Sequence, residues 1–252
     1  MISAMIYFTK RSWPKFTLRG LLLLVACAAV AALFVRDRQQ AELRSRAFAH
    51  MREIALALRT LEGTAGEFPR AVIPVTTGRP SHSWRLQLAP LIDYSEADYD
   101  YREAWNSPRN QLLGQQRNLV YCWDESPHAG QEHSTNVLGI VGPGAAFDPQ
   151  RSEPLTLRAD LADLICAIEV RNSDIPWMQP RDLDYRNLLA SDPGRVPQLG
   201  ASDESFCVIF LDGKVWRLRT DTPRDRLVQL MTIDGAIEND RDALLEHFHT
   251  SP

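Results

Sequence analysis

The first pattern along the chain is an uncharged apolar run near its N-terminus. Residues 20–35 read GLLLLVACAAVAALFV, and extending the run back to Phe16 adds a single charge, that of Arg19. A helix that crosses a bilayer needs about 20 apolar residues, and an arginine near its end can reach the headgroups. The pattern predicts one transmembrane helix over 16–36, preceded by a basic leader at 1–15. The residues expected to anchor the chain in the membrane are Phe16, Leu21, Leu22, Leu23, Leu24, Val25, Val30, Leu33, Phe34 and Val35.

The same run fits two other kinds of N-terminal segment. It is short and alanine-rich, with the A-x-A spacing of a cleaved signal peptide. The stretch Leu24-Val25-Ala26-Cys27 is also similar to a lipoprotein cleavage box, although the chain stays apolar after Cys27. We prefer the transmembrane helix and keep these two as alternatives.

A second apolar pattern continues the helix beyond the membrane. Its residues recur at intervals of three and four, which places them on one helix face. The stripe consists of Leu43, Ala47, Met51, Ile54, Leu58 and Leu61. Gly63 and Gly66 end the helix, and Pro69 cannot continue it. We expect a helical continuation over 37–62 whose stripe packs on the domain that follows, 63–252.

The rest of the chain reads as short strands, short helices and loops. Runs of β-prone residues predict strands over 119–123, 136–141, 164–170, 206–211 and 214–218. The dipeptide Asp212-Gly213 between the last two runs is the signal for a tight hairpin turn. Short helices are expected over 83–92, 224–232 and 241–249, and an irregular proline-rich loop over 171–201. These elements predict an α+β fold in which a long N-terminal transmembrane helix packs on an antiparallel β-sheet domain.

Charge is unevenly placed along a chain of globular composition, which is 44% hydrophobic and 24% charged. Residues 1–46 have a net charge of +6, and the remaining 206 residues have a net charge of −10. A basic end beside an apolar run suits anionic lipid headgroups, whereas an acidic body repels the phosphates of nucleic acids. Basic residues flank the run on both sides, so the positive-inside rule is nearly balanced. We place the short leader in the cytoplasm, because a large domain that follows a signal-like run is normally exported.

The richest candidate site is an acidic and aromatic stretch over 174–192. It contains Asp174, Asp182, Asp184 and Asp192 together with Trp177 and Tyr185. Carboxylates could hold Ca²⁺ through oxygen ligands, and aromatic rings beside acids suit a glycan. A solvated loop that Trp177 anchors to the core is the simpler interpretation. We therefore assign no metal, cofactor or catalytic residue, and keep Asp174, Asp182 and Asp184 as weak metal candidates.

Other chemical patterns are weaker. The glycine-rich stretch 139–144 includes Pro143 and lacks a following Lys-Ser/Thr, so it predicts a turn and not a phosphate cradle. Zinc-ligating residue types gather in Cys122, His128, Glu132 and His133, but their spacing matches no standard zinc motif. The nucleophile patterns G-x-S-x-G and S-x-x-K do not occur in the sequence.

The cysteines give no disulfide framework. Cys122, Cys166 and Cys207 are an odd number in a domain expected outside the cytoplasm. Cys166 and Cys207 fall inside predicted strands, where small apolar thiols are usually buried. We expect buried free thiols.

A series of short motifs resembles a large bacterial family of prepilin-like proteins. In chain order these motifs are Met51-Arg52-Glu53-Ile54 to Leu58, Gly66-Glu67-Phe68-Pro69, Ser83-Trp84-Arg85, Glu103-Ala104-Trp105-Asn106-Ser107-Pro108, Thr135-Asn136 to Gly142-Pro143-Gly144, Ile175-Pro176-Trp177 to Asp182-Leu183, and Phe210-Leu211-Asp212-Gly213-Lys214-Val215. The family has a His-(nine residues)-Asp-Gly signature and is described as a domain of unknown function. The start Phe16-Thr17-Leu18 is similar to that of type IV pilins and secretion pseudopilins. The resemblance implies a pilin-like α+β architecture and a membrane-anchored, exported domain, and it implies no reaction.

Three positions depart from what the resemblance implies. Prepilin processing between Lys15 and Phe16 would require glycine before the phenylalanine, and Lys15 stands there. Gly20 holds the fifth mature position, where pilins carry the glutamate that registers subunits in a fibre. Ser202 stands where the signature histidine would be, ten residues before Asp212. Processing and filament assembly are therefore open, and the hairpin Asp212-Gly213 is the part of the signature that this chain retains.

Together these observations predict a single-pass protein of the cytoplasmic membrane with its C-terminal domain outside. We expect a structural or interaction role at the cell envelope and no enzymatic activity. The expected partners are the membrane, envelope proteins, or copies of the chain through its N-terminal helix, and not nucleic acid. One alternative is a Ca²⁺- or glycan-binding module that uses 174–192, and another is an envelope hydrolase with an unrecognised site.

Overall fold

The computed structural model describes residues 18–74, 80–92, 99–116, 118–123, 133–189, 198–200 and 204–250. The chain divides into two compact units, residues 1–41 and 42–252. Its fold is α+β, with a long apolar N-terminal helix and a mixed sheet.

The first unit contains the start of helix α1, which spans Leu18–Ala65. Every leucine, valine and phenylalanine from Leu21 to Val35 is 51–68% exposed. The helix is long and apolar enough to cross a membrane, a property that a membrane anchor shares with a signal sequence. The predicted apolar helix is confirmed to that extent. The anchor residue Phe16 and the predicted processing site at Lys15 and Phe16 lie outside the described residues.

In the second unit, α1 buries the face that the stripe predicted. Ala47, Met51, Ile54 and Leu58 are at most 2% exposed, because this face packs against the sheet. The helix ends at Ala65, three residues later than expected from the sequence. The reason is that Gly66 takes a positive φ of 77°, and its amide donates to the Glu62 carbonyl at 2.8 Å, which closes the last turn.

The main sheet has the strand order β5-β3-β4-β7-β8-β9, and β6 also pairs with β4. The strands are β3 (Val137–Val141), β4 (Ile165–Arg171), β5 (Leu183–Asp184), β6 (Gln198–Leu199), β7 (Ser205–Phe210), β8 (Val215–Arg219) and β9 (His249–Thr250). The predicted strands 136–141 and 164–170 and the β7–β8 hairpin are confirmed. The stretch predicted as an irregular loop, 171–201, includes β5, β6 and the 3-10 helix η3 (Tyr185–Leu189).

The prediction of a purely antiparallel sheet is wrong. Strand β5 pairs with β3 in parallel, with Ile140 opposite Leu183. The carboxylate of Asp182 accepts a hydrogen bond from the Gly139 amide at 2.8 Å. Asp182 directly precedes β5, so this contact holds the start of the strand beside β3, and two residues of pairing follow it.

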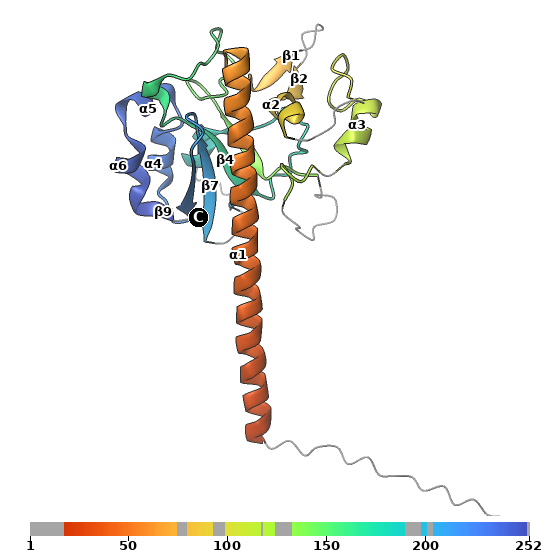
Figure 1. Cartoon of the computed structure of the whole chain (residues 1–252), viewed down its shortest axis with the longest axis vertical. Helices are drawn as coiled ribbons and strands as arrows, with labels where there is room; N and C mark the ends of the chain where they lie inside the picture. The colour runs from red at the N-terminus through yellow and green to blue at the C-terminus, as the bar shows by residue number, and fades with distance from the viewer. Residues whose placement is uncertain are drawn as a thin grey trace, which may run out of the picture. The chain divides into compact units, whose positions relative to one another are not determined.

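The sheet separates two apolar cores, as the alternation along β7 shows. Cys207 and Ile209 face the core that α1 covers, whereas Phe206, Val208 and Phe210 face the core that α4 and α6 cover. Strands β4 and β7 accordingly lie between α1 and the helices α4 and α6 (Figure 1). Both faces of these strands are buried, which explains why their sequences are mostly apolar, with Glu169 as a buried exception in β4.

The segment predicted as one helix over 83–92 is divided. A hairpin of β1 (Val72–Pro74) and β2 (Pro80–Ser83), which the sequence reading missed, leads into the short helices α2 (Trp84–Gln87) and η1 (Ala89–Leu91). The α-helix stops before Pro90 because proline has no amide hydrogen to donate to the preceding turn.

The strand predicted over 119–123 is also wrong. The carbonyl of Asn118 accepts from the amides of Tyr121 at 3.1 Å and Cys122 at 2.8 Å. The Asn118 side chain accepts from the Val120 amide at 3.0 Å. Asparagine thus closes a turn where the apolar pattern alone suggested a strand. Helix α3 (Pro108–Gly114) and the 3-10 helix η2 (Ala159–Leu161) are further short elements of the second unit.

The C-terminal helices differ from those expected at their ends. They are α4 (Arg224–Gln229), α5 (Ile233–Glu238), α6 (Arg241–Leu245) and the 3-10 helix η5 (Glu246–Phe248). The helix predicted over 224–232 ends early, because the Thr232 hydroxyl accepts from the Gly235 amide at 3.2 Å and begins α5 instead. Asp240 begins α6 in the same way through the Ala243 amide at 3.0 Å.

We expect the buried and exposed faces of α1 to respond differently to truncation. The change Ile54→Ala should lower the free energy of unfolding by about 2–5 kcal/mol, because Ile54 is fully buried and its loss leaves a cavity. The control Leu56→Ala, at a side chain that is 69% exposed, should change it by less than about 0.5 kcal/mol. Chemical unfolding of the full chain in detergent measures both, and equal losses would contradict this assignment of faces.

Candidate functional site

The guanidinium of Arg85 is fully buried in the second unit, where the residue is 0% exposed. Ser83 ends β2 and caps α2, and its hydroxyl accepts from the Arg85 amide at 3.3 Å and from Arg85 Nη1 at 2.7 Å. Arg85 Nε and Nη2 both donate to the Val137 carbonyl on β3, at 3.2 and 3.0 Å. The start of a short helix thus directs one arginine into the sheet.

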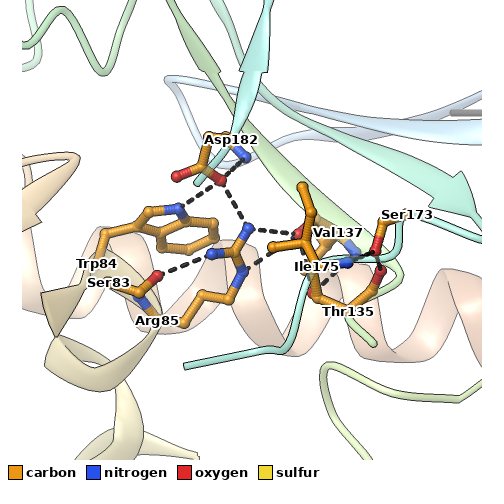
Figure 2. A network of polar contacts seen from close by, with 9 residues as sticks. Ser83, Trp84, Arg85, Thr135, Val137, Ser173, Ile175 and Asp182 are labelled. Carbon is orange, nitrogen blue, oxygen red and sulfur yellow. Dashed lines mark hydrogen bonds and ion pairs between the residues drawn. The ribbon is translucent and has the colours of Figure 1, made fainter. Parts of the chain in front are cut away.

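The counter-charge is Asp182, whose side chain is 2% exposed. Its Oδ1 accepts from Arg85 Nη2 at 2.6 Å, from the Gly139 amide at 2.8 Å and from Trp84 Nε1 at 3.1 Å. Burial raises the pKa of the Asp182 carboxyl, and the charge of Arg85 together with these hydrogen bonds opposes that rise. Figure 2 shows Trp84 and Arg85 converging on this one carboxylate.

The network continues through hydroxyl groups into the following loop. Thr135 Oγ1 donates to the Val137 carbonyl at 3.0 Å, and Ser173 Oγ donates to the Thr135 carbonyl at 2.7 Å (Figure 2). The Ile175 amide in turn donates to Ser173 Oγ at 3.3 Å. Three segments that are far apart in sequence are therefore tied together around one ion pair.

This arrangement is suited to holding the chain and not to reacting with a ligand. Both charges are buried and mutually paired, and aromatic rings enclose them: Trp84 stacks on Phe147 at 5.0 Å, and Tyr121 stacks on Trp177 at 5.9 Å. A buried ion pair with its hydrogen bonds satisfied acts as a specific brace. We name these residues, Ser83, Arg85, Val137 and Asp182, the buried brace.

The aspartates considered as weak metal ligands do not form a common site. Asp182 belongs to the buried brace, and Asp184 forms an ion pair with Arg186, which lowers the pKa of its carboxyl mainly through that hydrogen bond. Asp174 is exposed, and Asp192 lies outside the described residues. Within the described part of the chain, no three His, Cys, Asp or Glu side chains gather closely enough to hold a metal ion.

The structure describes some of the cysteines and zinc-ligating residue types that the sequence analysis singled out. Cys122, Cys166 and Cys207 are buried and are not joined in disulfides, as expected for the last two, and burial raises the pKa values of Cys166 and Cys207. His128 and Glu132 lie outside the described residues. The stretch 139–144 forms the end of β3 and a turn, in which Gly142 and Gly144 have positive φ.

The hairpin Asp212-Gly213 holds the C-terminal helices to the sheet. Asp212 binds Arg241 of α6, with Arg241 Nη1 donating to Oδ1 at 3.2 Å, and Arg241 Nε lies 2.9 Å from Asp163. Burial alone would raise the pKa of Asp212, but the hydrogen bonds from Arg241 and the Lys214 amide outweigh it and lower the pKa. The Arg241 guanidinium also lies 4.7 Å from the centre of the Phe210 ring. The sequence identified the hairpin but gave no indication of this partner.

The same hairpin forms one wall of an open groove of about 860 Å³. The opposite wall is α1, where Arg52, Leu56 and Arg59 face the groove. Gly213 has a φ of 86°, and a Cβ there would lie 2.6 Å from Arg59 Cγ, so the hairpin tip lies directly against the helix. We name this feature the α1–hairpin groove. Its walls combine apolar and charged side chains.

Comparisons of the chain with protein-family models, with curated proteins and with solved structures found no match.

We expect the buried brace to be strongly cooperative. The change Arg85→Met leaves the Asp182 carboxylate buried without its partner and should cost about 3–5 kcal/mol of unfolding free energy. The double variant Arg85→Met/Asp182→Asn should be more stable than Arg85→Met alone, because the amide needs no counter-charge. A double-mutant cycle measured by chemical unfolding checks this, and additive losses would argue against a coupled pair.

The Asp212–Arg241 pair should make stability depend on acid. Since the folded pKa of Asp212 lies below its ordinary value of 3.8, its contribution is present above that value and disappears as the pH falls through the folded pKa. Asp212→Asn should therefore be less stable than the wild type at pH 7, with a difference that shrinks below about pH 4. The control Asp221→Asn, at a 57% exposed partner of Arg219, should have little effect at either pH. Thermal unfolding between pH 3 and 7 measures this, and a constant difference would contradict it.

Proposed function

We propose that this chain is a membrane-anchored, prepilin-like protein whose α+β domain lies outside the cytoplasmic membrane. Its role is structural, through binding of other proteins at the cell envelope, and not enzymatic. The proposal rests on one observation, that two parts of α1 have different surfaces. One part of the helix exposes an unbroken apolar surface, and the part within the second unit supplies a buried face of the core.

The continuity of α1 favours an anchor over a cleaved signal sequence. No break separates the apolar part from the part that enters the core, and α1 is helical from Leu18 to Ala65. The basic residues of the leader, Lys10, Arg11 and Lys15, suit the anionic headgroups of the cytoplasmic leaflet. The order of helix, sheet and Asp-Gly hairpin also agrees with the architecture that the resemblance implies.

The α1–hairpin groove supports a role in protein binding. It is open along its length, and its walls combine an exposed leucine with arginine and lysine side chains. A binding surface with an apolar centre and a charged rim is typical of protein interfaces. The alternative Ca²⁺ or glycan site over 174–192 is less well supported, because Asp182 and Asp184 are already paired with arginines.

We expect the chain to remain in the membrane pellet of a bacterial host after an alkaline carbonate wash. Substituting Leu23→Arg and Val30→Arg should release it, because each arginine at the centre of a span costs about 2.5–3.5 kcal/mol of insertion free energy. The control Leu112→Arg, on the exposed surface of α3, should leave the chain in the pellet. A wild-type chain that appears in the soluble fraction would refute the anchor.

Orientation and processing are tested on the same preparation. Protease added to intact spheroplasts should digest the α+β domain, since we place it outside. Mass spectrometry of the membrane fraction should find an N-terminus at or near Met1, because Lys15 and Gly20 depart from the processing pattern. A chain that begins at Phe16 would instead favour a pilus-like assembly, and a domain protected from protease would contradict the orientation.

A further inference from the structure

A second buried polar cluster of the domain is centred on His82, which lies in β2 and is 1% exposed. Its Nδ1 lies 2.6 Å from the Tyr99 hydroxyl, and its Nε2 lies 2.9 Å from the Tyr101 carbonyl oxygen. Both tyrosine rings also meet the imidazole edge to face, at centroid distances of 5.4 and 5.3 Å. We name these three residues the His82 cluster, which joins β2 to the segment 99–101.

The two partners of His82 determine which form of the ring is present. A carbonyl oxygen only accepts, so we assign the hydrogen of the neutral ring to Nε2, which donates it to Tyr101. Nδ1 then has a lone pair and accepts from the Tyr99 hydroxyl. Both ring nitrogens are therefore satisfied while His82 is neutral.

A proton on Nδ1 would disrupt this arrangement. The new ring hydrogen would point at a hydroxyl that donates to the same nitrogen, so one of the two hydrogens would lose its acceptor. The charge would also lie beside Tyr99, which is 8% exposed and belongs to the apolar core that α1 covers. A charge buried there without a counter-charge is costly.

The charged groups around the His82 cluster are engaged elsewhere. The titratable and charged side chains of the described segments next to His82 are Tyr99, Asp100, Tyr101, Arg102, Glu103 and Arg85. Asp100 lies 3.6 Å from Arg102 and 3.5 Å from Arg109, and Arg85 belongs to the buried brace. Strand β1, which pairs with β2, has no titratable side chain. Residues 75–79 and 93–98 lie outside the described part of the chain, and within that part no carboxylate forms an ion pair with His82.

The segment that His82 holds has a separate attachment to α3. Asn110 accepts from the Asp100 amide at 2.9 Å and donates to the carbonyls of Asp100 and Ala104, both at 3.0 Å. Toward β2 and α2, the segment is held by the two hydrogen bonds of His82 and by one from the Tyr101 hydroxyl to the Leu86 carbonyl at 3.3 Å. Loss of the His82 bonds would therefore loosen the segment from β2 while its contacts with α3 remain.

We propose that the His82 cluster is an acid-sensitive latch, in which uptake of a proton by His82 releases residues 99–101 from β2. The released segment exposes the ring of Tyr99 and stays attached to α3 through Asn110. This inference adds a means of regulation to the proposed function and does not depend on it, because the latch is a property of the folded domain.

The direction of the pH dependence follows from burial. Burial lowers the pKa of His82 below its ordinary value of 6.5, and the hydrogen bond to the Tyr101 carbonyl opposes this change. In the released form the ring meets water and its pKa returns toward 6.5. The closed latch is therefore fully favoured above that pH, and it loses stability as the pH falls from 6.5 through the lower pKa of the closed form.

Hydrogen exchange of the full chain in detergent, measured by mass spectrometry and corrected for the intrinsic effect of pH, tests the latch. Between about pH 7.5 and about pH 5, protection of peptides from 99–104 should fall several-fold, whereas peptides from β7 should keep theirs. The change His82→Gln should abolish this fall, because the amide donates and accepts like the neutral ring but does not titrate. The matched control His247→Gln, at an exposed histidine, should respond like the wild type.

The response of another histidine is separated by its place in the chain. Burial also lowers the pKa of His50, which lies on α1 and stacks on Trp123 at 5.4 Å. Its protonation should change the exchange of peptides from α1 and 118–123, and His82→Gln should leave that change in place.

A second variant tests the proton itself, and it decides the question even if His82→Gln does not fold. Tyr99→Phe removes the hydroxyl that favours the neutral ring, so the midpoint of release should move to higher pH. An NMR titration of the His82 ring should show the Nε2–H form at neutral pH and the same shift of midpoint. Unchanged protection of 99–104 in acid, an equal fall in His82→Gln, or a Tyr99→Phe midpoint at or below that of the wild type would overturn the proposal.

Discussion

One buried ion pair determines how the second unit is assembled. Arg85 and Asp182 are at most 2% exposed, so each depends on the other, Arg85 donates to the Ser83 hydroxyl, and Asp182 accepts from Trp84 and Gly139. An arginine in such a place tolerates only one arrangement of its neighbours, because any displaced partner leaves a charge in an apolar interior. Asp182 directly precedes β5, so the ion pair holds the start of the strand that pairs with β3 in parallel.

The two cores show how one sheet satisfies two sets of helices. Strand β7 presents alternate residues to α1 on one side and to α4 and α6 on the other. The Asp212 turn then connects these layers, because Arg241 of α6 binds its carboxylate while Arg59 of α1 lies against Gly213. A two-residue turn thus contacts helices from opposite faces of the sheet, which gives the Asp-Gly pair a structural role in this fold.

Sequence reasoning predicted the parts in which a single local signal dominates. The stripe of α1, the buried strand β4 and the Asp-Gly hairpin follow from periodicity and turn chemistry. The predictions were wrong where a polar side chain overrides the apolar pattern. Asn118 closes a turn at a segment predicted as a strand, and Thr232 begins a new helix inside a segment predicted as one helix. The ion pair was not predictable, because 97 residues separate its members and neither stands in a spacing that indicates the other.

The burial of the thiols determines when in the life of a molecule they can be oxidised. In the folded chain Cys166 and Cys207 lie inside the core, and burial keeps them protonated and out of reach of oxidants. Outside the cytoplasm, an oxidising environment would act on them only while the chain is unfolded. Disulfide-linked forms would then accumulate solely from molecules that had not reached, or had lost, the native state. In the location that we propose, the redox state of these cysteines would therefore record whether a given copy folded before it was exposed.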